Sequence, residues 1–202
     1  SSVDLSGSIF TNALHSSVTF SHSVLVGANF SGASGGSLNF SFANLTEVTF
    51  IDVSFPQAIA SSANLSDADL TNSEFRYSIF SNASLPYATL TNAQFDGALL
   101  DNANLVGSNL VDTNLLGATL TSAVLRDAVL TRADLQDANL SYANLNRATL
   151  DAASLINANL SQVNMSGTNL SGSNLSGADL NRATLISSDF SLANLTNANL
   201  EW

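Results

Sequence analysis

The 202-residue chain has no Cys, no Lys and only two Pro, Pro56 and Pro86. Without Cys it can form neither disulfide bonds nor thiolate metal sites. Five Arg oppose 16 Asp and Glu, which gives a net charge of -11, and charged residues make up only 10% of the chain. This balance argues against direct binding of nucleic acids or anionic membranes, because clustered Lys and Arg supply that attraction.

Long apolar runs are missing as well. No stretch approaches the roughly 18 apolar residues of a membrane-spanning helix, so we expect no transmembrane segment. The first ten residues, SSVDLSGSIF, have neither the basic start nor the continuous apolar core of a signal peptide. Any export signal was therefore removed, lies outside this sequence or never existed.

What fills the chain is a five-residue repeat, as in ADLQDANLSYANLNRATL at residues 133–150. We number each repeat by its central residue, i, which falls on every multiple of five from Leu5 to Leu200. Of these 40 positions, 26 are Leu, ten are Phe and one is Met, and the exceptions are His15, Gly35 and Ala60. Position i-2 holds 25 Ala, with Ser, Val or Thr elsewhere apart from one Leu. The repeat predicts two inward layers, one of large and one of small side chains.

A period of five fits neither a helix nor a long alternating strand. Residues i-2 and i can share one side of a short extended segment while i-1 faces outward. A type II turn would then follow, because it favours Pro at i+1 and Gly or Asn at i+2. Both prolines occupy i+1, and seven Asn occupy i+2. Nine of the 11 glycines also occupy i+2: Gly7, Gly27, Gly32, Gly97, Gly107, Gly117, Gly167, Gly172 and Gly177.

Longer spacings indicate how many corners close one coil. Phe55, Phe75 and Phe95 recur at every fourth repeat, and the series that takes every fourth repeat from Leu5 contains no Phe. Four corners, and hence four repeats per coil, are therefore expected. About ten coils, stacked at the ~4.8 Å spacing of β-strands, would make a rod of about 48 Å.

The pattern of a small residue, Asn or Asp, Leu and two variable residues resembles the pentapeptide-repeat family over essentially the whole chain. The resemblance implies an all-β right-handed quadrilateral β-helix. We expect a single solenoid domain over residues 1–202, irregular in its first three coils (1–60), where His15, residues 31–40 and Ala60 depart from the pattern. Such proteins abound in photosynthetic bacteria and occupy the cytoplasm, periplasm or thylakoid lumen. The resemblance does not choose between these compartments.

The chain has few of the residue types that an active site needs. The only imidazoles are His15, at an inward position, and His22, at a corner, so no set of nucleophile, base and orienting acid can be assembled. We therefore expect a non-enzymatic protein with no catalytic residues, metal ligands, cofactor or small-molecule substrate. Asn-x-Ser/Thr triplets such as Asn44-Leu45-Thr46 follow mechanically from the repeat and are weak evidence for glycosylation.

Two functions of solenoid surfaces serve as alternatives. Some relatives of this family mimic DNA and protect or inhibit the topoisomerase gyrase, which requires an organised acidic surface. Sorted by four faces, however, the acids number four, five, four and three. Less favoured still is ice binding, for which seven Thr face outward from one side of the coil: Thr11, Thr49, Thr71, Thr89, Thr91, Thr131 and Thr149.

The remaining interpretation is that the protein is a rigid structural or protein-binding module with an unidentified protein partner. Outward positions near the sixth coil hold a concentration of aliphatic residues, which we call the belt. Exposed apolar residues in number mark contact sites. The belt consists of Leu99, Val106, Val111, Leu116, Val124 and Val129.

Overall fold

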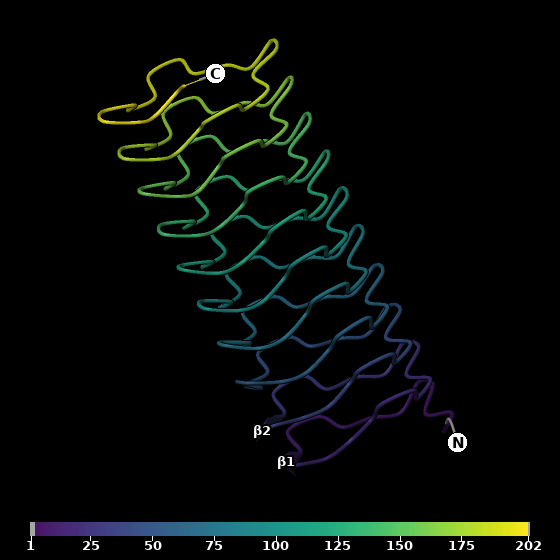
Figure 1. The fold of residues 1–202 in the computed structure, drawn as a ribbon. Coiled ribbons are helices and arrows are strands. Elements are labelled where there is room, and N and C mark those ends of the chain that lie inside the picture. The colour runs from purple at the N-terminus through teal and green to yellow at the C-terminus, as the bar shows by residue number, and fades with distance from the viewer. Residues whose placement is uncertain (1–2, 202) are drawn as a thin grey trace.

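The computed structural model describes residues 3–201 as a rod of stacked rectangular coils (Figure 1). Parallel β-bridges join the residue at i-1 of each repeat to the i-1 residue four repeats later, from Asp4 with Val24 at one end to Asp179 with Asn199 at the other. Each coil therefore takes four repeats, one for each side of the rectangle. The architecture is a right-handed quadrilateral β-helix, as the resemblance to the pentapeptide-repeat family implies.

Hydrogen bonds tie each coil to the coils before and after it. In one repeat, the N–H of Leu25 donates to the Asn44 carbonyl at 2.7 Å, while the N–H of Val24 donates to the Val3 carbonyl at 2.9 Å. Most faces contain a single bridging residue because a corner follows so soon. The two longer strands are β1 (Leu14–Ser16) and β2 (Ser34–Gly36), which pair in parallel with His15 opposite Gly35.

The corners form at positions i+1 and i+2, where the backbone at i+2 has positive φ. A typical corner closes with the N–H of Ala28 donating to the Leu25 carbonyl at 3.0 Å, and Gly27 there has a φ of 63°. Gly and Asn tolerate this conformation, which explains their enrichment at i+2. Residues such as Tyr77 and Arg132 also adopt it, at a cost of about 1–2 kcal/mol each that the surrounding ladder must offset.

The core has the two predicted layers. Large residues at position i and small residues at i-2 are buried along the middle of the rod. Phe rings pack against one another in the N-terminal half, for example Phe75 and Phe80 with centroids 5.3 Å apart, whereas Leu fills the C-terminal half. Several buried hydroxyls at i-2 donate to core carbonyls, as Thr113 Oγ1 does to Leu90 at 2.7 Å, whereas Ser73 Oγ has no partner among the described residues. Such bonds let Ser and Thr replace Ala inside the coil.

Candidate functional site

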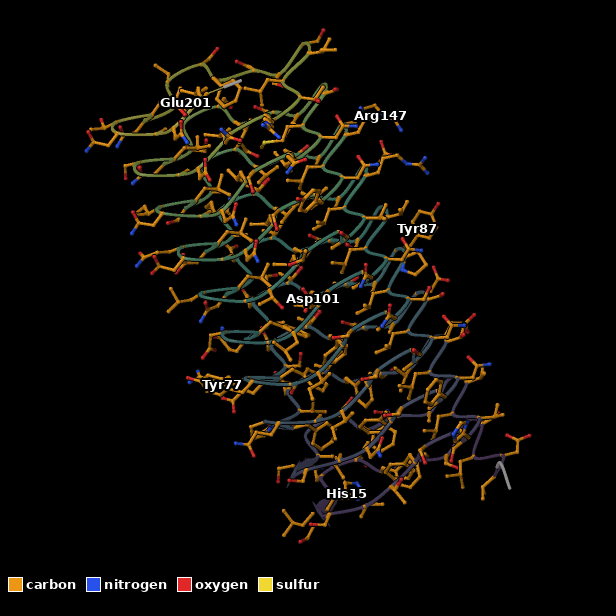
Figure 2. The ribbon with its side chains drawn as sticks, in the orientation of Figure 1. His15, Tyr77, Tyr87, Asp101, Arg147 and Glu201 are labelled. Carbon is orange, nitrogen blue, oxygen red and sulfur yellow. The ribbon has the colours of Figure 1, made fainter. Side chains whose placement is uncertain are left out.

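The surface divides into four faces, named by the inward column that each covers. The first face covers the Leu5 column, and the second, third and fourth cover those of Phe10, His15 and Phe20. Tyr77 and Tyr87 project from opposite sides of the rod, and Arg147 lies on the side of Tyr87 (Figure 2). All outward positions belong to i-1, i+1 and i+2 of each repeat.

Outward side chains at positions i+1 of one coil and i-1 of the next are direct neighbours on one face. Asn64 Nδ2 donates to Thr46 Oγ1 at 3.0 Å, and Thr119 Oγ1 donates to Asp101 Oδ2 at 2.7 Å. In each pair the earlier residue is at i+1 and the later one is at i-1 of the next coil. The same spacing relates Val106 to Val124 on the first face.

Four members of the belt form two such neighbouring pairs. Val106 and Val124 make one pair, and Val111 and Val129 make the other, on the second face. The four valines are half-buried. The two faces are adjacent and meet at the corner that carries Gly107.

The other two members lie elsewhere. Leu99 belongs to the fourth face and Leu116 to the third, and both are exposed, at 38% and 39%. The register thus pairs Val106 with Val124 and Val111 with Val129 on two adjacent faces but does not place Leu99 or Leu116 beside either pair. We call the four valines the valine patch.

The sequence analysis missed two apolar residues beside the valine patch. The N–H of Tyr87 donates to the Val106 carbonyl at 2.9 Å, and the Tyr87 ring covers Gly107 so closely that a Cβ there would be 2.7 Å from it. Pro86 occupies the i+1 position one coil before Val106. A search at a spacing of four repeats would have found Pro86 together with Val106.

A second apolar feature on the fourth face was also missed. Parallel bridges join Ile59 to Ile79 and Ile79 to Leu99, so these three outward residues stack in consecutive coils. We call them the aliphatic ladder. Its signal in the sequence is an aliphatic residue at i-1 in every fourth repeat.

An aliphatic residue at i-1 gives up a local hydrogen bond that polar residues make there. Asn44 Oδ1 accepts from the Thr46 N–H at 3.2 Å and from Thr46 Oγ1 at 2.7 Å. Asn or Asp elsewhere at i-1 caps the corner in the same way. Ile, Leu and Val cannot accept such a bond, so each one at i-1 forgoes about 1 kcal/mol of local stabilisation. This bond also explains the Asn-x-Ser/Thr triplets without glycosylation.

The charges are spread over all four faces, and several acids are paired. Arg132 contacts both carboxylate oxygens of Asp112 at 2.7 Å, and Arg147 contacts those of Asp127 at 2.7 and 2.8 Å. These arginine hydrogen bonds lower the pKa of Asp112 and of Asp127 below their usual values. The densest acidic group without such a cation lies on the second face and its corners: Glu47, Asp52, Asp67 and Asp69.

The outward Thr of the second face do not form a regular free array. Thr71 Oγ1 donates to Asp69 Oδ1 and Thr131 Oγ1 donates to Asp151 Oδ1, both at 2.6 Å. Val111 interrupts the same column between them. Hydroxyls engaged within the protein are not free to match an ice lattice, which weakens that alternative.

His15 lies inside an aromatic cage. Its ring centroid is 6.0 Å from those of Phe10, Phe20 and Phe30, and 6.3 Å from that of Phe55. Within the described chain His15 Nε2 is buried without a hydrogen-bond partner, and burial lowers the pKa of this imidazole. His22, the other imidazole, is exposed and stacks on Phe42 with centroids 4.9 Å apart.

This cage predicts a pH dependence of stability. The groups that face His15 are uncharged, so protonation would place an uncompensated cation among Phe rings. The unfolded chain takes up a proton near pH ~6.5, before the folded chain does, so stability should fall as the pH is lowered from 7 toward 5. Urea denaturation at several pH values should show this fall for the wild type and a smaller one for His15→Leu. Equal slopes would contradict the prediction, since His22 is retained in both proteins.

Residues 3–201 show no pocket, no group of three or more His, Asp or Glu placed to hold a metal ion, and no helix that could cross a membrane.

Comparison with known proteins identifies the family of this chain. The family model described as pentapeptide repeats matches residues 1–34, 16–52, 39–76, 63–102, 98–137, 128–167 and 164–201. The chain is a pentapeptide-repeat protein. No curated protein matches it.

Among solved structures, this pentapeptide-repeat protein is similar to HetL from the cyanobacterium Nostoc sp. strain PCC 7120, which is involved in the regulation of heterocyst differentiation. The identity is 28%, the TM-score is 0.85, and the match covers 97% of this chain and 86% of HetL. Full-length QnrB1, a plasmid-mediated fluoroquinolone resistance protein, is 22% identical with a TM-score of 0.65. That match covers 83% of this chain and 93% of QnrB1, and at this identity it shows the fold alone.

Proposed function

We propose that this protein is a non-enzymatic, rigid protein-binding module whose contact site is centred on the valine patch. The observation that carries the proposal is the pairing of Val106 with Val124 and of Val111 with Val129 on two faces that meet at one corner. Tyr87 extends the patch at that corner and is 66% exposed. Tyr is enriched among the interface residues that carry most of the binding energy.

The similarity to HetL supports a regulatory setting for this contact. HetL is involved in the regulation of a differentiation process, and the match spans nearly the whole chain. A rod without a pocket in its described residues can take part in regulation by holding another protein. We therefore favour a regulatory partner protein over a small-molecule ligand.

DNA mimicry is the less favoured alternative. The acids lie on four faces, and the Arg pairs with Asp112 and Asp127 neutralise part of the charge. The group formed by Glu47, Asp52, Asp67 and Asp69 spans two coils only. Mimicry of a duplex needs acids along a longer line of the surface.

The experiment is affinity capture from the lysate of the source cell with three baits. They are the wild type, a patch variant with Val106→Ser and Val111→Ser, and a control variant with Ile59→Ser and Ile79→Ser on the fourth face. Ser is common at these outward positions, so both variants should keep the fold, which circular dichroism would check. We expect a partner that the wild type and the control retain and that the patch variant loses at least tenfold.

The same capture can overturn the proposal. A partner retained equally by all three baits would show that the contact site lies outside the valine patch. If that partner were a topoisomerase, DNA mimicry would become the better account.

A further inference from the structure

The fourth face carries almost no charge although the protein as a whole is strongly acidic. Across eight consecutive coils, from residue 18 to residue 162, its residues and those of its outer corner include one charged side chain, Asp101. The other outward residues of this face are mostly Ser, Asn and Thr. A surface with so little charge does not repel a second copy of the same acidic chain.

The aliphatic ladder lies in the middle of this face. Ile59 and Ile79 are half-buried, Leu99 is 38% exposed, and Tyr77, at the corner beside them, is 63% exposed. A column of Ser runs along the other side of the ladder, at Ser41, Ser61 and Ser81. The face thus has an apolar column and a hydroxyl column that run side by side.

We infer that the fourth face is a dimer interface that binds a second copy of this chain, with the two rods antiparallel and Ile79 at the two-fold axis. Rows of side chains on this face repeat at the coil spacing of about 4.8 Å, and a second copy presents rows at the same spacing. In this arrangement Ile59 lies opposite Leu99 of the second copy, and Ile79 lies opposite its own counterpart. Apolar residues therefore meet apolar residues.

The position of Asp101 selects the antiparallel arrangement. With Ile79 at the axis, Asp101 lies opposite Ser61 of the second copy, whose hydroxyl can donate a hydrogen bond to the carboxylate. A parallel pair of rods whose two-fold axis runs along position i, in the middle of the face, would instead place Asp101 opposite Leu99 of the other copy. Burying a carboxylate against aliphatic side chains is costly, so the antiparallel pair is favoured.

The remaining acids do not prevent this association. Asp179 and Glu201 belong to the fourth face but lie beyond the seven coils that pair, Asp137 lies at the corner that borders the third face, and the others lie on other faces. Charges are screened over about 8 Å at physiological ionic strength. Seven coils of about 4.8 Å give a contact about 34 Å long, and five residues give a width of about 16 Å. The total buried area is then about 1,000 Å², near the lower bound of specific interfaces, so the dimer should be weak.

Analytical ultracentrifugation over a concentration series tests the inference. The wild type should show a concentration-dependent equilibrium between monomer and dimer. Ile79→Asp should weaken the dimer at least 100-fold, because two carboxylates would meet at the axis. Asp already occupies the same repeat position at residues 69, 134 and 179, so this variant should fold normally.

Val129→Asp is the matched control, since it makes the same change at position i-1 on the second face. It should leave the dimer unchanged, and Ile79→Asp should in turn leave capture of a partner by the valine patch unchanged. The dimer inference and the proposed function can therefore be disproved independently of each other. A wild type that stays monomeric at about 0.5 mM, or equal disruption by both variants, would overturn the inference.

A gain-of-affinity variant tests the antiparallel register. Ser61→Arg places a cation opposite Asp101 of the second copy, and Arg already occupies position i+1 at residues 76 and 126. We expect the dimer to tighten several-fold at low salt and less at high salt. No change in affinity would show that the register is wrong.

Discussion

Phe55→Ala is expected to lower the free energy of unfolding by about 3–5 kcal/mol. Phe55 is fully buried, and its ring centroid lies 5.9 Å from that of Phe50, 6.0 Å from that of Phe75 and 6.2 Å from that of Phe40. Removing the ring would leave a cavity between rigid coils that cannot collapse to fill it. Chemical denaturation followed by circular dichroism measures the loss.

Phe42→Ala is the control for Phe55→Ala because it deletes the same side chain from the surface. Phe42 is 57% exposed and contacts mainly His22, so the loss should not exceed about 1 kcal/mol. Each coil contacts only its neighbours, so hydrogen exchange should locate the Phe55→Ala damage in the coils around residue 55. Equal losses for the two variants would mean that the aromatic core does not stabilise the rod.

Gly35→Ala is expected to destabilise the first coils by about 3 kcal/mol or more. A Cβ at Gly35 would come within 2.1 Å of the His15 carbonyl oxygen and 2.8 Å of its carbonyl carbon. The obstruction is backbone that is held in the β1 and β2 pairing, so it cannot move aside as a flexible side chain could. The free energy of unfolding and the exchange of amides in residues 13–18 would report the damage.

The adjacent Gly36 provides the control for Gly35→Ala. A Cβ there would meet nothing within 4 Å, and its φ is not positive. Gly36→Ala should therefore be neutral, or stabilising by up to about 1 kcal/mol through the lower entropy of the unfolded chain. The prediction fails if both alanine variants behave alike.

The role of Gly35 illustrates where the sequence analysis was incomplete. The sequence shows that Gly35 stands above the inward His15, which suggests that it leaves space for the imidazole. In the structure the nearest atom to an added Cβ is instead the His15 carbonyl oxygen. The close approach of the two paired backbones, β1 and β2, depends on local dihedral angles that a repeat pattern does not contain.

The belt shows the same limit for the candidate site. Its six residues were correctly recognised as outward positions, because the inward and outward sides alternate along each short segment. Which of them are neighbours depends on the register between successive coils, which sets the side-chain contacts and the bridges. That register separates Leu99 and Leu116 from the valine patch and instead adds Leu99 to the aliphatic ladder with Ile59 and Ile79.

The sequence by itself determined the family, the β-helix, the inward layers and the corner positions. The layers and corners follow from local rules, because side chains alternate across a short extended segment and only some residues tolerate positive φ at a corner. The family and its β-helix follow from the resemblance of the repeat pattern. The tertiary structure alone decided which outward residues form one surface, how His15 packs, and which acids are paired. Those features depend on contacts between successive coils, where residues distant in sequence meet across a spacing of about 4.8 Å.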